Sequence, residues 1–183
     1  MSKPSSGHFK GTGGSQAKQH RSFTNGGTYG SIKSNLNLRE QPTKYKQLSS
    51  KKLKLLREKE ANRTLTKAEY KHKEWQRRLS ARRDEGIKSF WKEERKRILK
   101  GLPTTRNWNA TQRKDIIAGK RPKFGGKTIV SHHTYSVSKY PHLANRKEII
   151  YPATFYEHIH RWHGGNTRNS LPGRPINPIK EQF

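Results

Sequence analysis

The excess of positive charge constrains this chain more than any other feature of its sequence. The 183 residues include 41 Lys and Arg against 13 Asp and Glu, which gives a formal net charge of +28, and only 28% of them are hydrophobic. Buried apolar side chains must offset the conformational entropy that is lost on folding, and so polar a chain cannot achieve this along its whole length. We therefore expect a small packed domain accompanied by long solvated stretches.

The same charge indicates the kind of partner. A large cation attracts polyanions, because neutralised phosphates release their condensed counterions. Nucleic acid is the expected partner, with an anionic membrane surface and an acidic protein as rivals. No membrane insertion is expected, since no apolar run approaches the ~20 residues that cross a bilayer and no segment resembles a signal peptide. The chain has no cysteine, which excludes disulfides and thiolate metal sites.

Composition divides the first hundred residues into two parts. Residues 1–48 carry eight Lys and Arg against one acid and are rich in Gly and Ser. They are predicted to be a disordered basic linker, with a junction to a larger delivery protein as the alternative. Residues 49–100 predict a basic helical segment, in which Thr66 and Glu69 form a capping box that starts a helix near Lys67. The apolar stripe is thin, so these helices are expected to face solvent or to lie along a partner.

Residues 101–183 predict a compact α+β domain. A short helix capped by Asn109 precedes two strands, "GKTIVSHHTYS" and "KEIIYPAT", and Pro152 is expected to stop the second one. A capping box formed by Thr154 and Glu157 then opens a last helix, which should end at the following Gly-Gly pair. Histidines therefore occur on the first strand and on the last helix.

Six of the nine histidines lie between His132 and His163. Neutral imidazoles bind divalent transition metals, and an unliganded imidazole with a pKa of about 7 can take a proton from an attacking water. Neighbouring side chains of a strand point to opposite faces, so His132 and His133 suit different roles. On a regular helix His163 lies about 140° around from His158, and the last turn must widen before both can bind one ion.

The two histidine stretches together resemble a known family. "SHH" followed by "EHIHRWHGGN", with 24 residues between His133 and His158, is similar to the HNH/endonuclease VII (His-Me finger) superfamily. It looks closest to the branch with a Gly-His-His triplet, found as toxin domains of bacterial polymorphic toxins. The resemblance covers about residues 105–178 and implies a ββα unit that holds one divalent cation, Mg, Mn, Ni or Zn, and cuts nucleic acid. Carried over residue by residue, it makes His132, His158 and His163 the metal ligands and His133 the general base.

The sequence departs from the family pattern at two places. The middle asparagine of the HNH motif has no counterpart, because its position falls on Ile149, with Asn145 and Glu148 nearby. The group that orients His133 therefore stays open. Ser131 stands where family members often have glycine.

Further expectations concern nucleic-acid contacts. Arginine matches phosphate oxygens in a bidentate manner, and basic residues near the motif favour contact with a phosphate backbone, although solvated surface side chains are the simpler interpretation. His160 points away from His158 on a regular helix and is interpreted as a phosphate contact or a surface residue. The predicted contacts are Arg121, Lys123, Lys127, His160, Arg161, Arg168 and Arg174. Phosphate contacts carry no direct sequence information, so little sequence preference is expected.

As a whole, the resemblance implies an antibacterial toxin. Such a protein is made in the bacterial cytoplasm, is secreted or delivered into the cytoplasm of a target cell, damages double-stranded DNA, and is blocked by an acidic cognate immunity protein. Two alternatives stay open: a non-enzymatic RNA- or ribosome-binding protein, which this composition also suits, and a phage or mobile-element endonuclease without a toxin role. The histidine cluster separates the first alternative from a nuclease, because a binding protein does not need convergent imidazoles.

Overall fold

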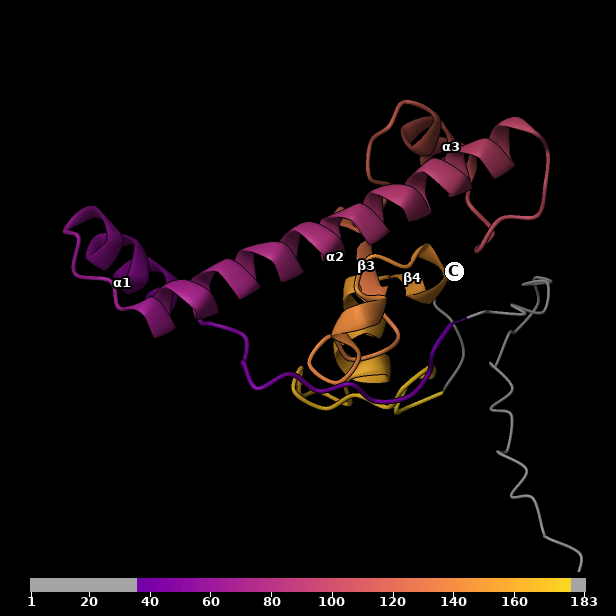
Figure 1. The fold of residues 1–183 in the computed structure, drawn as a ribbon. Coiled ribbons are helices and arrows are strands. Elements are labelled where there is room, and N and C mark those ends of the chain that lie inside the picture. Colours follow the sequence, from indigo (N-terminus) through magenta and orange to yellow (C-terminus); the bar gives the residue numbers. More distant parts are fainter. Residues whose placement is uncertain (1–35, 179–183) are drawn as a thin grey trace, which may run out of the picture.

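A long helix, α2, runs the length of the structure, a computed structural model that describes residues 36–178. Helix α1 lies against its N-terminal end, α3 against its C-terminal end, and the strands below its middle (Figure 1). The helices and strands are α1 (Ser50–Ala61), α2 (Lys67–Leu99), α3 (Ala110–Ile117), β1 (Lys123–Phe124), β2 (Lys127–Thr128), β3 (Val130–His133), β4 (Ile150–Ala153), the 3-10 turns η1 (Pro141–Leu143) and η2 (Lys147–Ile149), and η3 (Glu157–Trp162). The fold is of the α+β class, as the sequence predicts.

Helices α2 and α3 begin at capping boxes. The Thr66 hydroxyl accepts a hydrogen bond from the Glu69 N–H at 3.2 Å, and the Glu69 carboxylate accepts one from the Thr66 N–H at 3.1 Å, so α2 begins at Lys67. Asn109 and Gln112 make the same reciprocal pair at the start of α3. Both pairs satisfy N–H groups that the first turn of a helix leaves without a partner.

One face of α2 belongs to the core. Leu79 packs with Val137 and Ala144 in one cluster, and Trp91 packs against a second cluster that contains Trp108. The thin apolar stripe of α2 therefore packs in the core. The partner along which this helix lies is the rest of the same chain.

Helix α2 approaches the backbone of the domain closely at Gly86. A Cβ atom at this position would lie 2.8 Å from the carbonyl oxygen of Ala144 and 3.0 Å from the carbonyl carbon of Asn145. Only a residue without a side chain permits this contact, although glycine inside a helix costs about 1 kcal/mol relative to alanine. The segment before η2 is thus held directly on the helix backbone.

Strands β3 and β4 form an antiparallel pair in which His132 lies opposite Tyr151 and Ser131 lies opposite Pro152. Pro152 was expected to stop the second strand, and it lies within the strand instead. Every strand of a two-stranded sheet is an edge strand, where proline is tolerated because its missing N–H can face away from the partner. Strands β1 and β2 form a separate small hairpin just before β3.

Residues 36–48, the last part of the predicted linker, lie along the domain. The Gln41 N–H donates to the carbonyl oxygen of Lys139 at 2.9 Å, and the Leu48 N–H donates to the Gln76 side chain at 2.9 Å. This segment connects the loop after β3 with α2. The predicted linker residues 1–35 lie outside the described residues.

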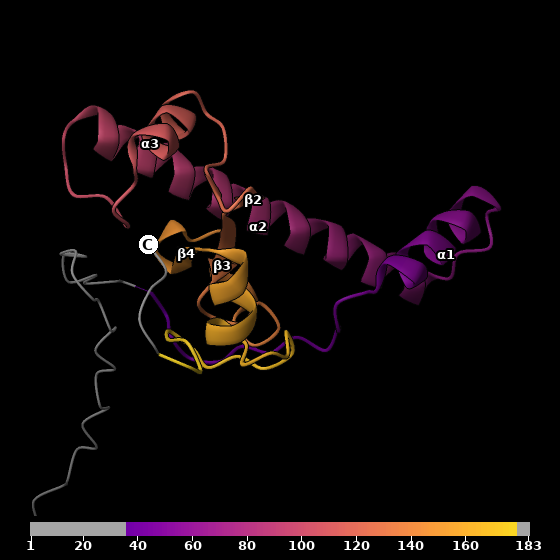
Figure 2. The same ribbon diagram turned by 180° about the vertical axis from the view of Figure 1, so that it is seen from behind.

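Helix α1 folds back on α2 and is fixed there by ion pairs. Lys59 lies 2.7 Å from Glu69, and Lys73 lies 2.5 Å from Glu60. In the view from behind, this helical hairpin lies at the end of α2 that is remote from the strands (Figure 2). Within residues 36–178 the helices are too short or too polar for any of them to span a bilayer.

Candidate active site

Three histidines from β3 and the last helix converge on one point. His132, His158 and His163 each offer one ring nitrogen, and these nitrogen atoms all lie within 4.8 Å of one another. The ring centroids of His158 and His163 are 4.8 Å apart, and that of His132 lies 5.2 and 5.0 Å from them. Imidazole nitrogens are good ligands for divalent transition metals, so this group, called the histidine trio below, can hold one cation.

The widened turn that His158 and His163 need is present as a π-helix. Helix η3 (Glu157–Trp162) has π geometry, and the Gly165 N–H closes it by donating to the carbonyl oxygen of Ile159 at 2.8 Å. A π-helix pairs residues that are five apart, which brings these two histidines onto the same side. Short π segments are rare and occur frequently at functional sites.

A buried arginine fixes the start of this helix. Thr154 and Glu157 form the predicted capping box, with the Thr154 N–H donating to the Glu157 carboxylate at 2.7 Å. The Arg106 guanidinium donates to both oxygens of that carboxylate, at 2.7 and 3.0 Å, and to the carbonyl oxygen of Pro152 at 2.8 Å. Arg106 therefore ties β4 to η3. No sequence signal joins Arg106 to Glu157, which lies 51 residues away.

The ring of His163 is oriented by a backbone carbonyl. Its Nδ1 lies 2.5 Å from the carbonyl oxygen of Asn169. A proton on Nδ1 satisfies this contact and leaves the lone pair of Nε2 free for a metal, which is the arrangement that hydrogen-bonded metal-binding histidines adopt. The ring of His132 is packed against Trp162, with centroids 4.6 Å apart.

His133 lies outside the histidine trio, as its alternate position in β3 requires. It is buried, and its Nε2 lies 3.0 Å from the carbonyl oxygen of Ala144. A proton on Nε2 donates to that carbonyl and leaves Nδ1 as an acceptor. The group that orients His133 is therefore a main-chain atom, held in place by the contact of Ala144 with Gly86.

Burial favours the neutral form of His132, His133 and His158. Desolvation, together with the neighbouring histidines, lowers the pKa of His132 to about 2. Desolvation also lowers the pKa of His133 to about 4, although the hydrogen bond to Ala144 acts in the opposite direction. The pKa of His158 is lowered by burial and by His163. Metal binding requires neutral imidazoles, and the lowered pKa values of His132 and His158 favour this form.

These shifts predict that the metal-free protein loses stability on acidification. The folded-state pKa values of His132 and His133 lie below the usual value of 6.5. Below about pH 6.5 the unfolded chain therefore binds protons that the folded chain excludes. Stability that is present above this pH should fall as the pH drops toward about 4. Urea unfolding of the chelator-treated protein across this range tests the expectation, and His133→Gln should reduce the slope. A pH-independent midpoint would contradict it.

Ser131, which replaces the glycine of the family triplet, binds two side chains. Its hydroxyl oxygen accepts a hydrogen bond from the Trp91 indole at 2.9 Å and one from the Arg121 guanidinium at 2.8 Å. The guanidinium carbon also lies 5.5 Å from the centroid of the Trp91 ring. Ser131 and His133 are two residues apart in a strand and share one face. Arg121 is thus held on the face of β3 that carries His133.

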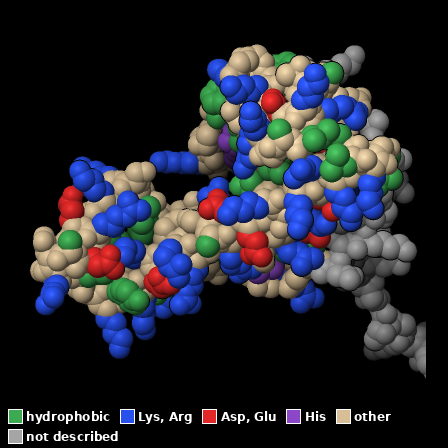
Figure 3. Space-filling model, turned by 90° about the horizontal axis from the view of Figure 1, so that it is seen from above, with side chains coloured by type: hydrophobic (Ala, Val, Ile, Leu, Met, Phe, Trp, Pro, Cys, Tyr) green, Lys and Arg blue, Asp and Glu red, His purple; other side chains and the backbone are tan. Residues whose placement is uncertain are grey.

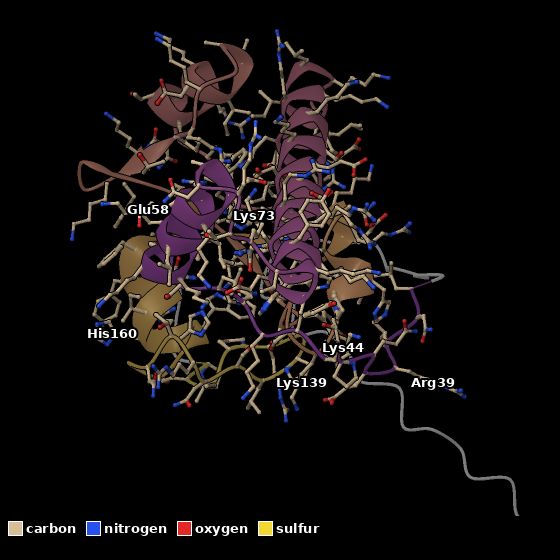
Figure 4. The ribbon with its side chains drawn as sticks, turned by 60° about the vertical axis from the view of Figure 1, so that its left-hand side comes forward. Arg39, Lys44, Glu58, Lys73, Lys139 and His160 are labelled. Atoms are coloured by element: carbon tan, nitrogen blue, oxygen red, sulfur yellow. The ribbon has the colours of Figure 1, made fainter. Side chains whose placement is uncertain are left out.

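The other predicted phosphate contacts are more dispersed. Lys127, on the β1–β2 hairpin with Lys123, places its ammonium 4.4 Å from the centroid of the Phe155 ring, beside the start of η3. His160 is exposed, lies against Tyr156 and points to the periphery of the molecule (Figure 4). The structure does not bring His160 into the trio. Arg161 is half-buried, and the two arginines after η3, Arg168 and Arg174, are exposed.

The described residues form a small α+β domain in which three histidines converge. Residues 73–154 match the family model described as GHH signature containing HNH/Endo VII superfamily nuclease toxin, which agrees with the resemblance seen in the sequence. The match begins inside α2, earlier than the span of about 105–178 expected from the sequence, and it ends before His158 and His163. The inclusion of α2 agrees with its packing in the core. No curated protein and no solved structure matches the chain.

Proposed function

We propose that this protein is a metal-dependent endonuclease that hydrolyses phosphodiester bonds in double-stranded DNA and acts as an antibacterial toxin. The observation that carries the proposal is the convergence of three histidine nitrogens within 4.8 Å, next to the buried His133, in a chain that matches a nuclease toxin family. A protein that only binds RNA or ribosomes has no use for this arrangement.

The histidine trio is proposed as the metal site. His132, His158 and His163 would hold one divalent cation, which when bound polarises a phosphoryl oxygen and stabilises the leaving oxygen. Three protein ligands leave at least one coordination position for a substrate oxygen or water. A donor set made only of imidazole nitrogens suits Zn and Ni better than Mg, which prefers oxygen ligands.

His133 is proposed as the general base. Its Nε2 is engaged by the Ala144 carbonyl at 3.0 Å, which leaves Nδ1 to accept the proton of an attacking water. Because its pKa is lowered to about 4, the ring is neutral and able to accept a proton at neutral pH. A bound phosphate brings negative charge close to the ring and favours the protonated form that the reaction generates.

Arg121 is proposed to grip the phosphate that is cleaved. The Ser131 hydroxyl and the Trp91 ring hold its guanidinium on the same face of β3 as His133. A guanidinium matches two phosphate oxygens at once. The dispersed contacts at Lys123, Lys127, Arg161, Arg168 and Arg174 would add affinity for the backbone without sequence preference.

The toxin role rests on the matched family, whose description names a nuclease toxin. We propose a bacterial origin, delivery into a target cell, and an immunity protein in the producing cell. That protein should be acidic, because the chain it must cover carries a net charge of +28. A gene for such a protein next to this one would favour the toxin over a phage endonuclease.

Two assays on the purified chain test the proposal. Supercoiled plasmid is incubated with the protein and Mg, Mn, Ni or Zn, with and without a chelator, and nicking is expected only with metal. The same cations should raise the Tm of the wild type, because a ligand that binds the folded state stabilises it. His158→Ala should lose this rise in Tm, whereas His160→Ala, two residues along the same helix and outside the trio, should keep it.

One set of results would refute the nuclease proposal. A chain that binds plasmid and RNA, cuts neither with any of the four cations, and shows no metal-induced rise in Tm would refute the nuclease. The RNA- or ribosome-binding alternative would then explain the chain better.

A further inference from the structure

We infer that the cleft between α2 and residues 145–148 binds the phosphate backbone of a nucleic acid, at a site separate from the predicted contacts around the histidines. This inference rests on the proposed function and names where its substrate extends. The cleft, called the α2 cleft below, encloses about 690 Å³ and is open to solvent. Lysine and arginine side chains are spread over the face of the molecule seen from above, with patches of acidic side chains between them (Figure 3).

The walls of the α2 cleft are predominantly basic. Two acids line it, Glu93 and Glu148, and both are engaged by basic neighbours: Glu93 lies 3.4 Å from Lys147, and Glu148 lies 3.4 Å from Arg146. Their negative charges are therefore largely compensated, and the excess of positive charge is available to a ligand. The basic side chains that line the cleft are Lys92, Arg95, Lys96, Lys100, Arg146 and Lys147.

The lysines on the helical wall form a row. Lys92 and Lys96 are four residues apart on one face of α2, about 6 Å from each other, and Lys100, the C-cap residue, comes four residues later. Among the described residues, Lys92 and Lys100 make no ion pair with an acid. A row of exposed charges along an open cleft fits a chain of repeated phosphates better than a single small anion.

The α2 cleft is also fixed in position relative to His133. Its loop wall begins at Asn145, whose neighbour Ala144 holds the His133 ring through its carbonyl. The backbone of Ala144 and Asn145 lies directly against α2 at Gly86. The Arg82 guanidinium, also on α2, donates to the Asn145 side chain at 3.2 Å. A backbone seated in the α2 cleft would therefore lie at a constant offset from the proposed general base.

Single-cysteine crosslinking tests the placement directly, because the chain contains no cysteine of its own. A photo-crosslinker is attached to Lys96→Cys in the cleft or to Lys51→Cys on α1, an exposed lysine of the remote helical hairpin. Each protein is mixed with a short labelled duplex in the presence of a chelator, so that nothing is cut. We expect a crosslink yield about tenfold higher from the cleft position, abolished by unlabelled duplex. Equal yields would overturn the inference.

Charge reversal gives a second, quantitative readout. Lys92→Glu with Lys96→Glu is compared with Lys51→Glu with Lys52→Glu, a pair on α1 with the same change in charge. Duplex affinity is measured with a chelator at several salt concentrations. The cleft pair should lower the slope of log affinity against log salt by about two, one for each lost phosphate contact, and the α1 pair by less.

These outcomes separate the cleft from the catalytic proposal, because the binding readout needs no cleavage. If the cleft pair loses affinity for the duplex while the wild type cuts nothing, the inference about the cleft is supported and the nuclease proposal is refuted. If the cleft pair binds and cuts like the wild type, the nuclease stands and the cleft inference fails. The α2 cleft would then be left for an acidic protein, such as the immunity protein.

Discussion

His133→Ala is expected to slow phosphodiester cleavage by about 10²- to 10⁴-fold, the usual contribution of a general base. The substitution removes the acceptor nitrogen but leaves the histidine trio intact, so the metal-induced rise in Tm should persist. Initial nicking rates of supercoiled plasmid, measured at saturating metal beside the thermal shift, give both quantities for one protein. Binding of the duplex in the presence of a chelator should be close to that of the wild type.

His142→Ala is the matched control for this prediction. His142 also directs its Nε2 at a backbone carbonyl, that of Asn37 at 2.7 Å, but it lies outside the trio. Its loss should leave the cleavage rate within a few-fold of the wild type. Cleavage by His133→Ala at the wild-type rate would assign the proton transfer to another group. Loss of the thermal shift in the same variant would mean that His133 supports the metal site instead.

Arg106→Met is expected to lower the free energy of unfolding by about 3–5 kcal/mol, because it removes the guanidinium that balances the buried charge of Glu157. Arg106 and Glu157 are almost completely buried and bonded through two nitrogen–oxygen contacts of 2.7 and 3.0 Å. Glu157 also caps η3, so the helix that carries His158 should lose its fixed start. Urea unfolding measures the first effect. Metal titration followed by Tm measures the second, as a weaker affinity.

The double variant Arg106→Met with Glu157→Gln distinguishes the two contributions. The double variant has no buried carboxylate charge at position 157, so it should regain much of the stability that the single variant loses. A single variant as stable as the wild type would show that water or a rearranged neighbour satisfies Glu157. If the double variant regains stability but not metal affinity, Arg106 serves to position η3.

Local patterns explain which parts of the fold were predictable. The capping boxes that start α2 and η3 and the Asn109 cap of α3 act over three residues, so sequence spacing reveals them directly. The widened last turn followed from spacing together with the family resemblance, which makes His158 and His163 ligands of one ion, because two histidines five apart meet only on a helix looser than the α-helix. The prediction that the second strand ends at Pro152 was wrong. A proline is tolerated in an edge strand, and the local sequence does not show how many strands a sheet has.

Contacts between distant segments were out of reach. The packing of α2 on the domain depends on a few apolar side chains and on Gly86. In the sequence, this glycine indicates only a residue that destabilises a helix. The pairing of Arg106 with Glu157 has no pattern that spacing could detect. The group that orients His133 could not be found either, because a carbonyl oxygen belongs to every residue and leaves no mark in the sequence.

The use of a main-chain oxygen to hold His133 has a consequence for how this site can vary. Any amino acid supplies a carbonyl, so the residue at position 144 is restricted by volume, being wholly enclosed against Leu79 and Val137, and not by its functional group. Substitutions in the neighbouring loop that keep the backbone in place should leave the His133 ring where it is, whereas a methyl group added at Gly86 would meet the Ala144 carbonyl oxygen that holds this ring. A search for related chains should therefore look for a small residue on the long helix paired with a small residue before β4, in place of an asparagine.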